Sequence, residues 1–326
     1  MPSSRPAPAP APAPASVKTP LADHQKGLLL TTLGVLMLTP DSLLVRLIDA
    51  EPFGLLVWRG LLQALGIVAI LALLHRSGPH PSVGAAFRAV GRPGLLLAAV
   101  FSGSTLFFIL ALSLTTVADV LVIIAAAPLT AAVFGWIFLG EGVPLRTWVA
   151  IALTLAGIAF LVSEDLGSGS LLGDLAAVVT ALCIGGTFVI ARHGRAVSMV
   201  PAMALAGLLT AAVALPAALL LEDGPLLYSG ARLGYALIMG LLVVPVSFAL
   251  ITVGPRYLPA AEVGLITLLE TVLGPFWVWL VLAEYPGDRA LLGGGLVVLA
   301  LAAHALAAHL TGSRRRPALR APKARD

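Results

Sequence analysis

The sequence predicts an all-α integral membrane protein with ten transmembrane helices, arranged as two inverted five-helix repeats, and with both termini in the cytoplasm. Of its 326 residues, 59% are hydrophobic and 11% are charged, whereas soluble domains carry about 25% charged residues. Apolar runs near the length of a membrane span recur along the chain, and its two halves can be aligned with each other. This composition excludes an ordinary soluble enzyme and a disordered chain.

The two ends of the chain differ from the rest in composition. Residues 2–15 are mostly Ala and Pro, which alternate from residue 6 onward, a pattern that favours extended polyproline II conformation and leaves nothing to bury. Residues 1–26 are therefore expected to form a disordered cytoplasmic tail, and the basic residues 310–326 a second cytoplasmic tail among lipid headgroups. A net charge of only +4 does not indicate a nucleic-acid partner. The single cysteine, Cys183, excludes an intramolecular disulfide.

Ten apolar runs account for most of the chain between these tails. A hydrocarbon core of about 30 Å requires roughly 20 helical residues. The runs near that length are 27–48, 54–74, 95–114, 117–138, 145–163, 171–192, 200–221, 233–253, 259–282 and 289–309. Several connections are very short, so neighbouring helices are expected to be antiparallel, with no folded domain outside the membrane. The two repeats would occupy residues 27–163 and 171–309.

The basic residues predict the orientation of the spans. With a cytoplasmic N-terminus, sixteen of the twenty Lys and Arg residues fall on the inner side, which is the distribution that the positive-inside rule requires. The outer connection at 163–174 carries three acidic residues and no basic one. Both termini are therefore predicted to be cytoplasmic. Short loops and a high content of Ala, Leu and Gly favour a bacterial inner membrane.

An internal repeat relates the two halves. A shift of 146 residues aligns the beginning of each half, and a shift of 143 aligns the fourth and ninth runs. The matched pairs are Gly27 with Gly173, Arg46 with Arg192, Asp119 with Glu262, Trp136 with Trp279 and Glu141 with Glu284. Because each unit has an odd number of spans, the two copies cross the membrane in opposite directions. Inverted repeats are typical of secondary transporters, whose substrate site lies near the midplane between the units.

The fourth and ninth spans carry a more detailed common pattern. In the first half, residues 111–119 read Ala-Leu-Ser-Leu-Thr-Thr-Val-Ala-Asp, Pro128 lies in mid-helix, and the span ends in Leu-Gly-Glu at Glu141. The second half repeats the acidic positions of this pattern at Glu262 and Glu284, and its mid-helix element is Leu269-Glu270. Thr271 occupies the place that corresponds to the mid-helix proline.

Over residues 27–309 this repeated pattern resembles EamA-type members of the drug/metabolite transporter (DMT) superfamily. In that family the mid-helix element usually reads Leu-Glu-Pro, so Thr271 is a departure from it, as is Ala283 in place of a glycine. The resemblance implies the transporter fold and a structural motif at Glu141, Glu262 and Glu284, with packing or capping as the role of Glu141 and Glu284 and a transport contact as the second interpretation. It does not identify a substrate, since such proteins move amino acids, metabolites, sugars or drugs.

Glu270 is the clearest candidate for a functional side chain. It lies in the middle of the ninth span with apolar turns on both sides, where an ionisable group costs a few kcal/mol unless it faces a partner or water. One interpretation makes it a carboxylate that binds substrate or a coupling proton. The alternative is a structural glutamate that hydrogen-bonds between helices, through Thr267 or Thr271.

Asp41, Arg59 and Asp119 form a second candidate group. All three fall in the outer half of the membrane, in or at the start of the first, second and fourth spans, and could meet. As a binding site, Arg59 would hold a substrate carboxylate and Asp41 a substrate amine. Alternatively, Asp41 and Arg59 form an internal salt bridge that closes the outer gate or satisfies both charges.

Trp58, Phe107 and Pro128 are candidates for lining the cavity. Tryptophan in membrane proteins is more often an interfacial anchor or a packing residue, which is the competing interpretation for Trp58. Pro128 also predicts a kink in the fourth span. His304 and His309 are five residues apart on one helix and do not share a face well, so no metal site and no cofactor are expected.

The sequence thus predicts a secondary transporter that exports small polar metabolites, such as amino acids, by alternating access. Protons are a candidate coupling ion, and the lipid bilayer is a partner. The alternatives are efflux of hydrophobic drugs or of lipid-linked or nucleotide-sugar-like substrates by the same fold, and, in another class, an intramembrane enzyme or a channel. The sequence contains no zinc-protease, serine-hydrolase or phosphate-loop motif. It does not fix the oligomeric state, with a monomer as one possibility.

Overall fold

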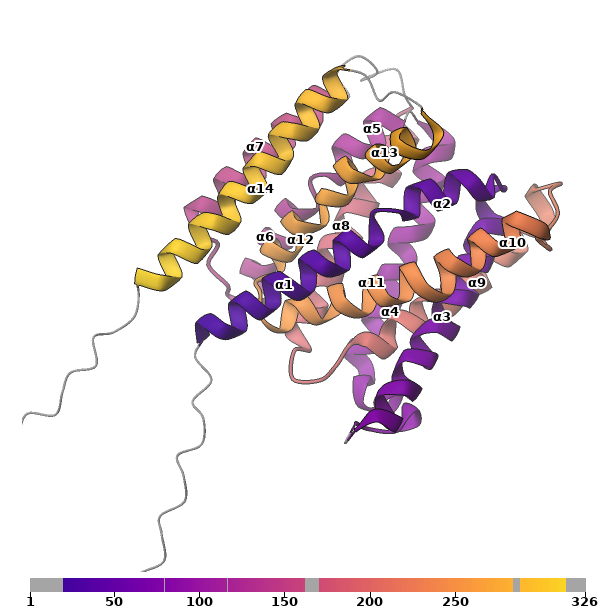
Figure 1. The fold of residues 1–326 in the computed structure, drawn as a ribbon, viewed down its shortest axis with the longest axis horizontal. Coiled ribbons are helices and arrows are strands. Elements are labelled where there is room, and N and C mark those ends of the chain that lie inside the picture. Colours follow the sequence, from indigo (N-terminus) through magenta and orange to yellow (C-terminus); the bar gives the residue numbers. More distant parts are fainter. Residues whose placement is uncertain (1–19, 79, 116, 162–169, 284–287, 315–326) are drawn as a thin grey trace, which may run out of the picture.

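The computed structural model describes residues 20–78, 80–115, 117–161, 170–283 and 288–314. All regular structure in these ranges is helical, and the helices pack side by side in one bundle (Figure 1). Glu284 lies outside the described residues, and so does the side chain of Asp119. The ends of the described chain, the start of α1 and the end of α14, lie on the same side of the bundle (Figure 1).

Seven helices make up the first half of the chain. They are α1 (Pro20–Leu38), α2 (Asp41–Ile48), α3 (Pro52–Ser77), α4 (Val83–Leu114), α5 (Val117–Ile124), α6 (Ala127–Leu139) and α7 (Leu145–Leu161).

The second half is built in a similar way, with a π-helical turn, Ile238–Val243, and a 3₁₀ turn, Gly254–Arg256, on either side of α11. Its α-helices are α8 (Leu171–His193), α9 (Val200–Leu221), α10 (Gly230–Leu237), α11 (Val244–Val253), α12 (Ala260–Thr267), α13 (Leu269–Leu282) and α14 (Asp288–Arg314).

Eight described segments are long and apolar enough to cross a membrane. Two shorter apolar helices, Leu145–Phe160 and Leu291–His304, fall at the fifth and tenth predicted spans. The third predicted span is longer than expected, because α4 begins at Val83 and not at residue 95. It is kinked at Gly91, whose φ of 52° lies in the region that favours glycine, just before Pro93.

Three of the ten predicted spans are broken in the middle. The first is interrupted at Thr39 and Pro40 between α1 and α2, the fourth at residues 125–126 between α5 and α6, and the ninth at Leu268 between α12 and α13. Proline has no N–H group, so Pro40 cannot satisfy the carbonyl of Leu36 four residues before it. The hydroxyl of Thr39 donates to that carbonyl at 2.8 Å instead, which makes the break stable in an apolar environment.

Helix contacts pair the two halves in a systematic way. Corresponding helices pack on each other in the pairs α3 with α9 and α7 with α14, while α1 packs on α11, α4 packs on α8 and α6 packs on α12. A two-fold relation between the halves exchanges the α1–α11 pair with the α4–α8 pair and leaves α3–α9 and α7–α14 unchanged. Figure 1 shows α7 and α14 side by side along one edge of the bundle.

Small residues allow the helices of one of these pairs to cross closely. Gly60 of α3 faces Gly207 of α9, and a Cβ atom at either position would press on the carbonyl oxygen of the other. Helices in a membrane gain little from the hydrophobic effect and depend on such close packing. The main buried cluster lies around Ile48, Met239 and Val263 and joins helices of both halves.

Candidate functional site

Two of the helix breaks place a carboxylate at the start of a helix. Asp41 is the first residue of α2, and Glu270 is the second residue of α13. The first N–H groups of a helix have no partner within it, and the positive end of the helix dipole stabilises an anion there. Because α2 packs on α13, the two carboxylates belong to one interface.

Arg59 of α3 joins this interface through an ion pair. Its Nη1 donates to Oδ2 of Asp41 at 2.6 Å, and the side chains are 19% and 9% exposed. The other carboxylate oxygen of Asp41, Oδ1, is buried and has no hydrogen-bond partner among the described residues. The Oδ1 oxygen of Asp41 is therefore still able to accept a hydrogen bond from a ligand.

Glu270 completes a group of three charges. Its carboxyl group interacts electrostatically with both Asp41 and Arg59. We refer to Asp41, Arg59 and Glu270 as the central cluster, which contains two acidic groups and one basic group. The adjacent Thr271 is partly buried. The hydroxyl of Thr267 donates to the carbonyl of Gly264 at 2.7 Å, so its proton is directed into its own helix and not toward Glu270.

The interface between α2 and α13 is closely packed. The indole Nε1 of Trp277 donates to the hydroxyl oxygen of Thr39 at 2.8 Å, which ties α13 to the break in the first span. Gly274 faces Ser42, and a Cβ atom there would lie 2.7 Å from the Ser42 hydroxyl oxygen. These contacts hold the two acidic helix starts in a fixed relation to each other.

The three candidates for lining the cavity lie in different surroundings. Trp58 stacks on Tyr228 with ring centroids 5.3 Å apart, and its Nε1 donates to the carbonyl of Leu226 at 2.5 Å. Phe107 is 39% exposed on α4. Pro128 is buried where α6 crosses α12 at Gly264. Contact of Trp58, Phe107 or Pro128 with a substrate stays a prediction.

Glu222, which was not among the residues predicted from the sequence, caps the start of α3. Glu222, just after α9, accepts hydrogen bonds from the backbone N–H groups of Phe53 at 2.7 Å and Gly54 at 2.8 Å. Nearby, burial raises the pKa of Tyr228 to about 12; the charge of Glu222 adds to this rise and Arg232 opposes it. The Tyr228 hydroxyl therefore stays protonated across the physiological range.

We expect the Glu222→Ala variant to lose about 1–2 kcal/mol of stability, because two N–H groups at the start of α3 lose a charged acceptor. The measurement is the midpoint of chemical unfolding of the protein in detergent. Glu51→Ala is the matched control, since Glu51 precedes the same helix but its side chain makes no capping bond. Equal losses in the two variants would show that the capping bond contributes nothing.

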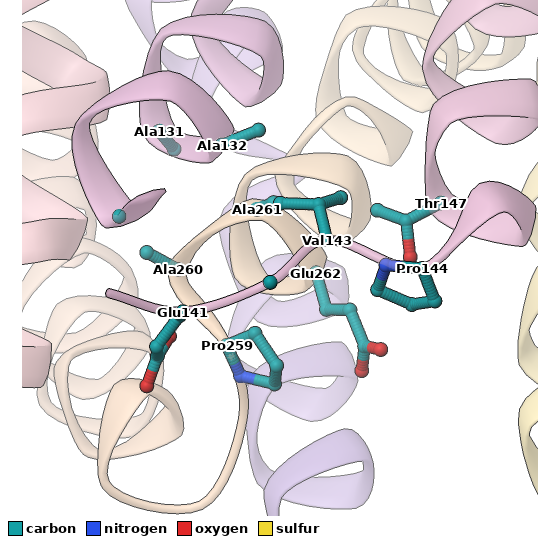
Figure 2. A pocket seen from close by; sticks show the side chains of 12 residues that line it. Ala131, Ala132, Glu141, Val143, Pro144, Thr147, Pro259, Ala260, Ala261 and Glu262 are labelled. Carbon is teal, nitrogen blue, oxygen red and sulfur yellow. The ribbon is translucent and has the colours of Figure 1, made fainter. Parts of the chain in front are cut away.

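The opposite end of the bundle holds the other acidic candidates. Glu141 accepts from Arg192 Nε at 2.7 Å, and Arg192 Nη1 donates to the carbonyl of Pro255 at 3.0 Å. Glu262 is buried and faces Arg146, with 3.5 Å between Oε1 and Nη2. Glu141 and Glu262 line the same small pocket (Figure 2).

Broken spans and charges between two related halves are typical of helical membrane transporters. The chain matches the EamA-like transporter family over residues 25–163 and 171–304 and belongs to that family. This confirms the resemblance on which the sequence interpretation depended. The protein is thus a multi-pass membrane transporter, with the lipid bilayer as its environment and a small molecule as its substrate.

Other comparisons support the fold alone. A solved crystal structure of a protein superposes with a TM-score of 0.71 and 20% sequence identity, covering 87% of this chain and 99% of its own. A comparison with curated proteins finds no significant match.

Proposed function

We propose that this transporter crosses the membrane ten times and exports small polar metabolites, with amino acids as the first class to test, by alternating access. The two shorter apolar helices within α7 and α14 pack on each other and would complete five spans in each repeat. An odd number of spans inverts the second repeat. The distribution of Lys and Arg supports cytoplasmic termini in a bacterial inner membrane, with residues 1–26 and 310–326 as the tails.

The central cluster carries this proposal. With both carboxyl groups ionised, Asp41, Arg59 and Glu270 have a net charge of −1. A carboxylate away from water is costly unless a positive group compensates it, and Oδ1 of Asp41 has no partner in the described structure. The site therefore favours a cationic ligand, either a proton or the ammonium group of a metabolite. Arg59 supplies the donors that a substrate carboxylate requires.

Competition between these two cations gives a mechanism for proton coupling. A proton on Glu270 or Asp41 removes the negative charge that an ammonium group needs, so the two ligands exclude each other. The breaks at Pro40 and Leu268 lie immediately beside these residues, where an interrupted helix allows the two halves of a span to move relative to each other. Binding of a proton or of an ammonium group therefore changes the charge beside the helix breaks of the first and ninth spans.

We expect the Glu270→Gln variant to lose the dependence of transport on a pH gradient, because an amide cannot exchange a proton. Purified protein is reconstituted in liposomes that contain a pH-sensitive dye, and a mixture of radiolabelled amino acids is supplied. Wild-type flux should rise with an imposed gradient, and the variant should show only the gradient-independent component.

Glu51→Gln is a suitable control, since Glu51 is an exposed carboxylate outside the cluster, and it should behave as the wild type. A Glu270→Gln protein that keeps the full pH dependence would refute coupling through this residue. Flux of hydrophobic cations without flux of amino acids would refute the proposed substrate class while leaving the transport fold intact.

A further inference from the structure

A second cluster of ionisable groups surrounds Glu262, at the end of α12 that is farther from Glu270. Glu262 is 3% exposed, and its Oε1 lies 3.5 Å from Arg146 Nη2 and 4.0 Å from His304 Nε2. Its other oxygen, Oε2, lies 3.6 Å from His24 Nε2. The four side chains come from α12, α7, α14 and α1. We refer to them as the Glu262 cluster.

Hydrogen bonding in this cluster is incomplete. Oε2 of Glu262, Nε2 of His24 and both ring nitrogens of His304 are buried without a hydrogen-bond partner in the described part of the chain. Thr147, next to Arg146, has an unpartnered hydroxyl as well. Buried polar atoms are normally satisfied by protein or by ordered water, so these atoms indicate a ligand that the protein itself does not supply.

The adjoining pocket limits the size of that ligand. It is lined by Glu262, Thr147 and Pro144 among others (Figure 2) and has room for about one water molecule. A metabolite cannot enter a space of this size. Among the described residues, no three His, Cys, Asp or Glu side chains are arranged to hold a metal ion. A proton, accompanied by a water molecule, is the ligand that fits.

We propose that Glu262, His24 and His304 form a proton-binding site that is separate from the central cluster and controls how tightly the helices close at this end of the bundle. With both imidazoles neutral, the charges of Glu262 and Arg146 cancel. A proton on either histidine gives the buried cluster a net positive charge. His304 faces the same carboxylate oxygen as Arg146, so its protonation sets two cations beside one acceptor atom.

The nearby charged groups do not relieve this excess. Arg192 is paired with Glu141 at 2.7 Å, and Lys26 lies over the ring of Tyr257, 5.2 Å from its centroid. Desolvation disfavours an uncompensated charge, so proton binding favours separation of α1 and α14 from α12 and entry of water. Because α1 belongs to the first half and α12 to the second, the separation of α1 from α12 occurs between the two repeats, whereas that of α14 from α12 occurs within the second repeat.

The first test compares thermal unfolding of the purified protein in detergent between pH 8 and pH 5.5. The wild-type midpoint should fall by about 3 °C more than that of the His24→Gln/His304→Gln double variant, because charging one histidine disfavours the closed cluster. His75→Gln/His193→Gln is the matched control, because both residues are exposed, and it should follow the wild type. Equal pH dependence in the wild type and in His24→Gln/His304→Gln would overturn the proposal.

A second test uses the wild-type chain and so does not depend on the folding of a variant. Hydrogen–deuterium exchange, corrected for the intrinsic effect of pH, is compared at pH 6 and pH 8. Peptides that cover residues 143–149 and 259–264 should exchange at least about threefold faster at the lower pH. Unchanged protection in both segments would refute opening at this end. Neither test involves substrate, so failure here leaves the proposed transport through the central cluster untouched.

Discussion

Replacement of Arg59 by methionine is expected to destabilise the folded protein by about 3 kcal/mol. Arg59 is the only basic group in the central cluster, and its removal leaves the nearly buried carboxylate of Asp41 beside Glu270 without compensation. Breaking a buried ion pair on one side costs about 3–5 kcal/mol, and we place the value at the lower end because Arg59 is 19% exposed. The measurement is equilibrium unfolding in detergent at pH 7.

Arg232→Met is the matched control for this prediction. Arg232 pairs with Asp49 at 3.4 Å, but these side chains are 45% and 87% exposed, so the loss should stay below about 1 kcal/mol. Adding Asp41→Asn to Arg59→Met removes the uncompensated charge and should recover more than half of the lost stability. A double variant as unstable as Arg59→Met alone would contradict the charge argument and leave packing as the cause.

The Gly60→Leu variant is expected to lose at least about 3 kcal/mol and to prevent accumulation of folded protein in the membrane. The added side chain would have to occupy the space of the Gly207 carbonyl, so α3 and α9 would have to separate along their whole contact. Expression level and elution as a single species in detergent measure the effect. A well-folded Gly60→Leu protein would show that this crossing tolerates separation.

Gly295→Ala serves as the control for Gly60→Leu. Gly295 lies within α14, and a Cβ atom built there meets no other atom within 4 Å. Alanine is preferred over glycine in a helix by roughly 1 kcal/mol, so this variant should be unchanged or slightly more stable. A large loss at Gly295 would mean that glycine is required there for another reason.

The helical membrane fold and its repeat could be predicted from the sequence because they depend on the length of apolar runs and on equivalent residues. The break before Pro128 could be anticipated because proline interrupts helical hydrogen bonding. The break at Leu268 lies 143 residues further along the chain, at the equivalent position of the second repeat. Proline chemistry alone does not predict this second break, because Thr271 stands where the first repeat has Pro128. The early start of α4 was missed because residues 83–94 are less apolar than the span that follows.

Prediction of the site was less complete. Asp41, Arg59 and Glu270 attract attention because charges in apolar runs are rare, and the structure brings all three to one interface. Glu222 gives no comparable signal, because it looks like an ordinary loop residue, and its partner N–H groups are 168 and 169 residues away in the chain. Contacts of this kind depend on helix packing, which the pattern of a single helix does not encode.

The halves of the chain are related in shape but differ in charge. The first span is broken at Thr39 and Pro40, whereas its counterpart α8 is continuous. The 146-residue offset places Thr187 at the position of Asp41, and the Thr187 hydroxyl donates to a carbonyl of its own helix at 2.9 Å. In the alternating access that we propose, the repeats exchange conformations, and the second repeat cannot reproduce the acidic helix start of the first. The two end states are therefore expected to differ in free energy, and the side chains that distinguish the repeats set their resting ratio.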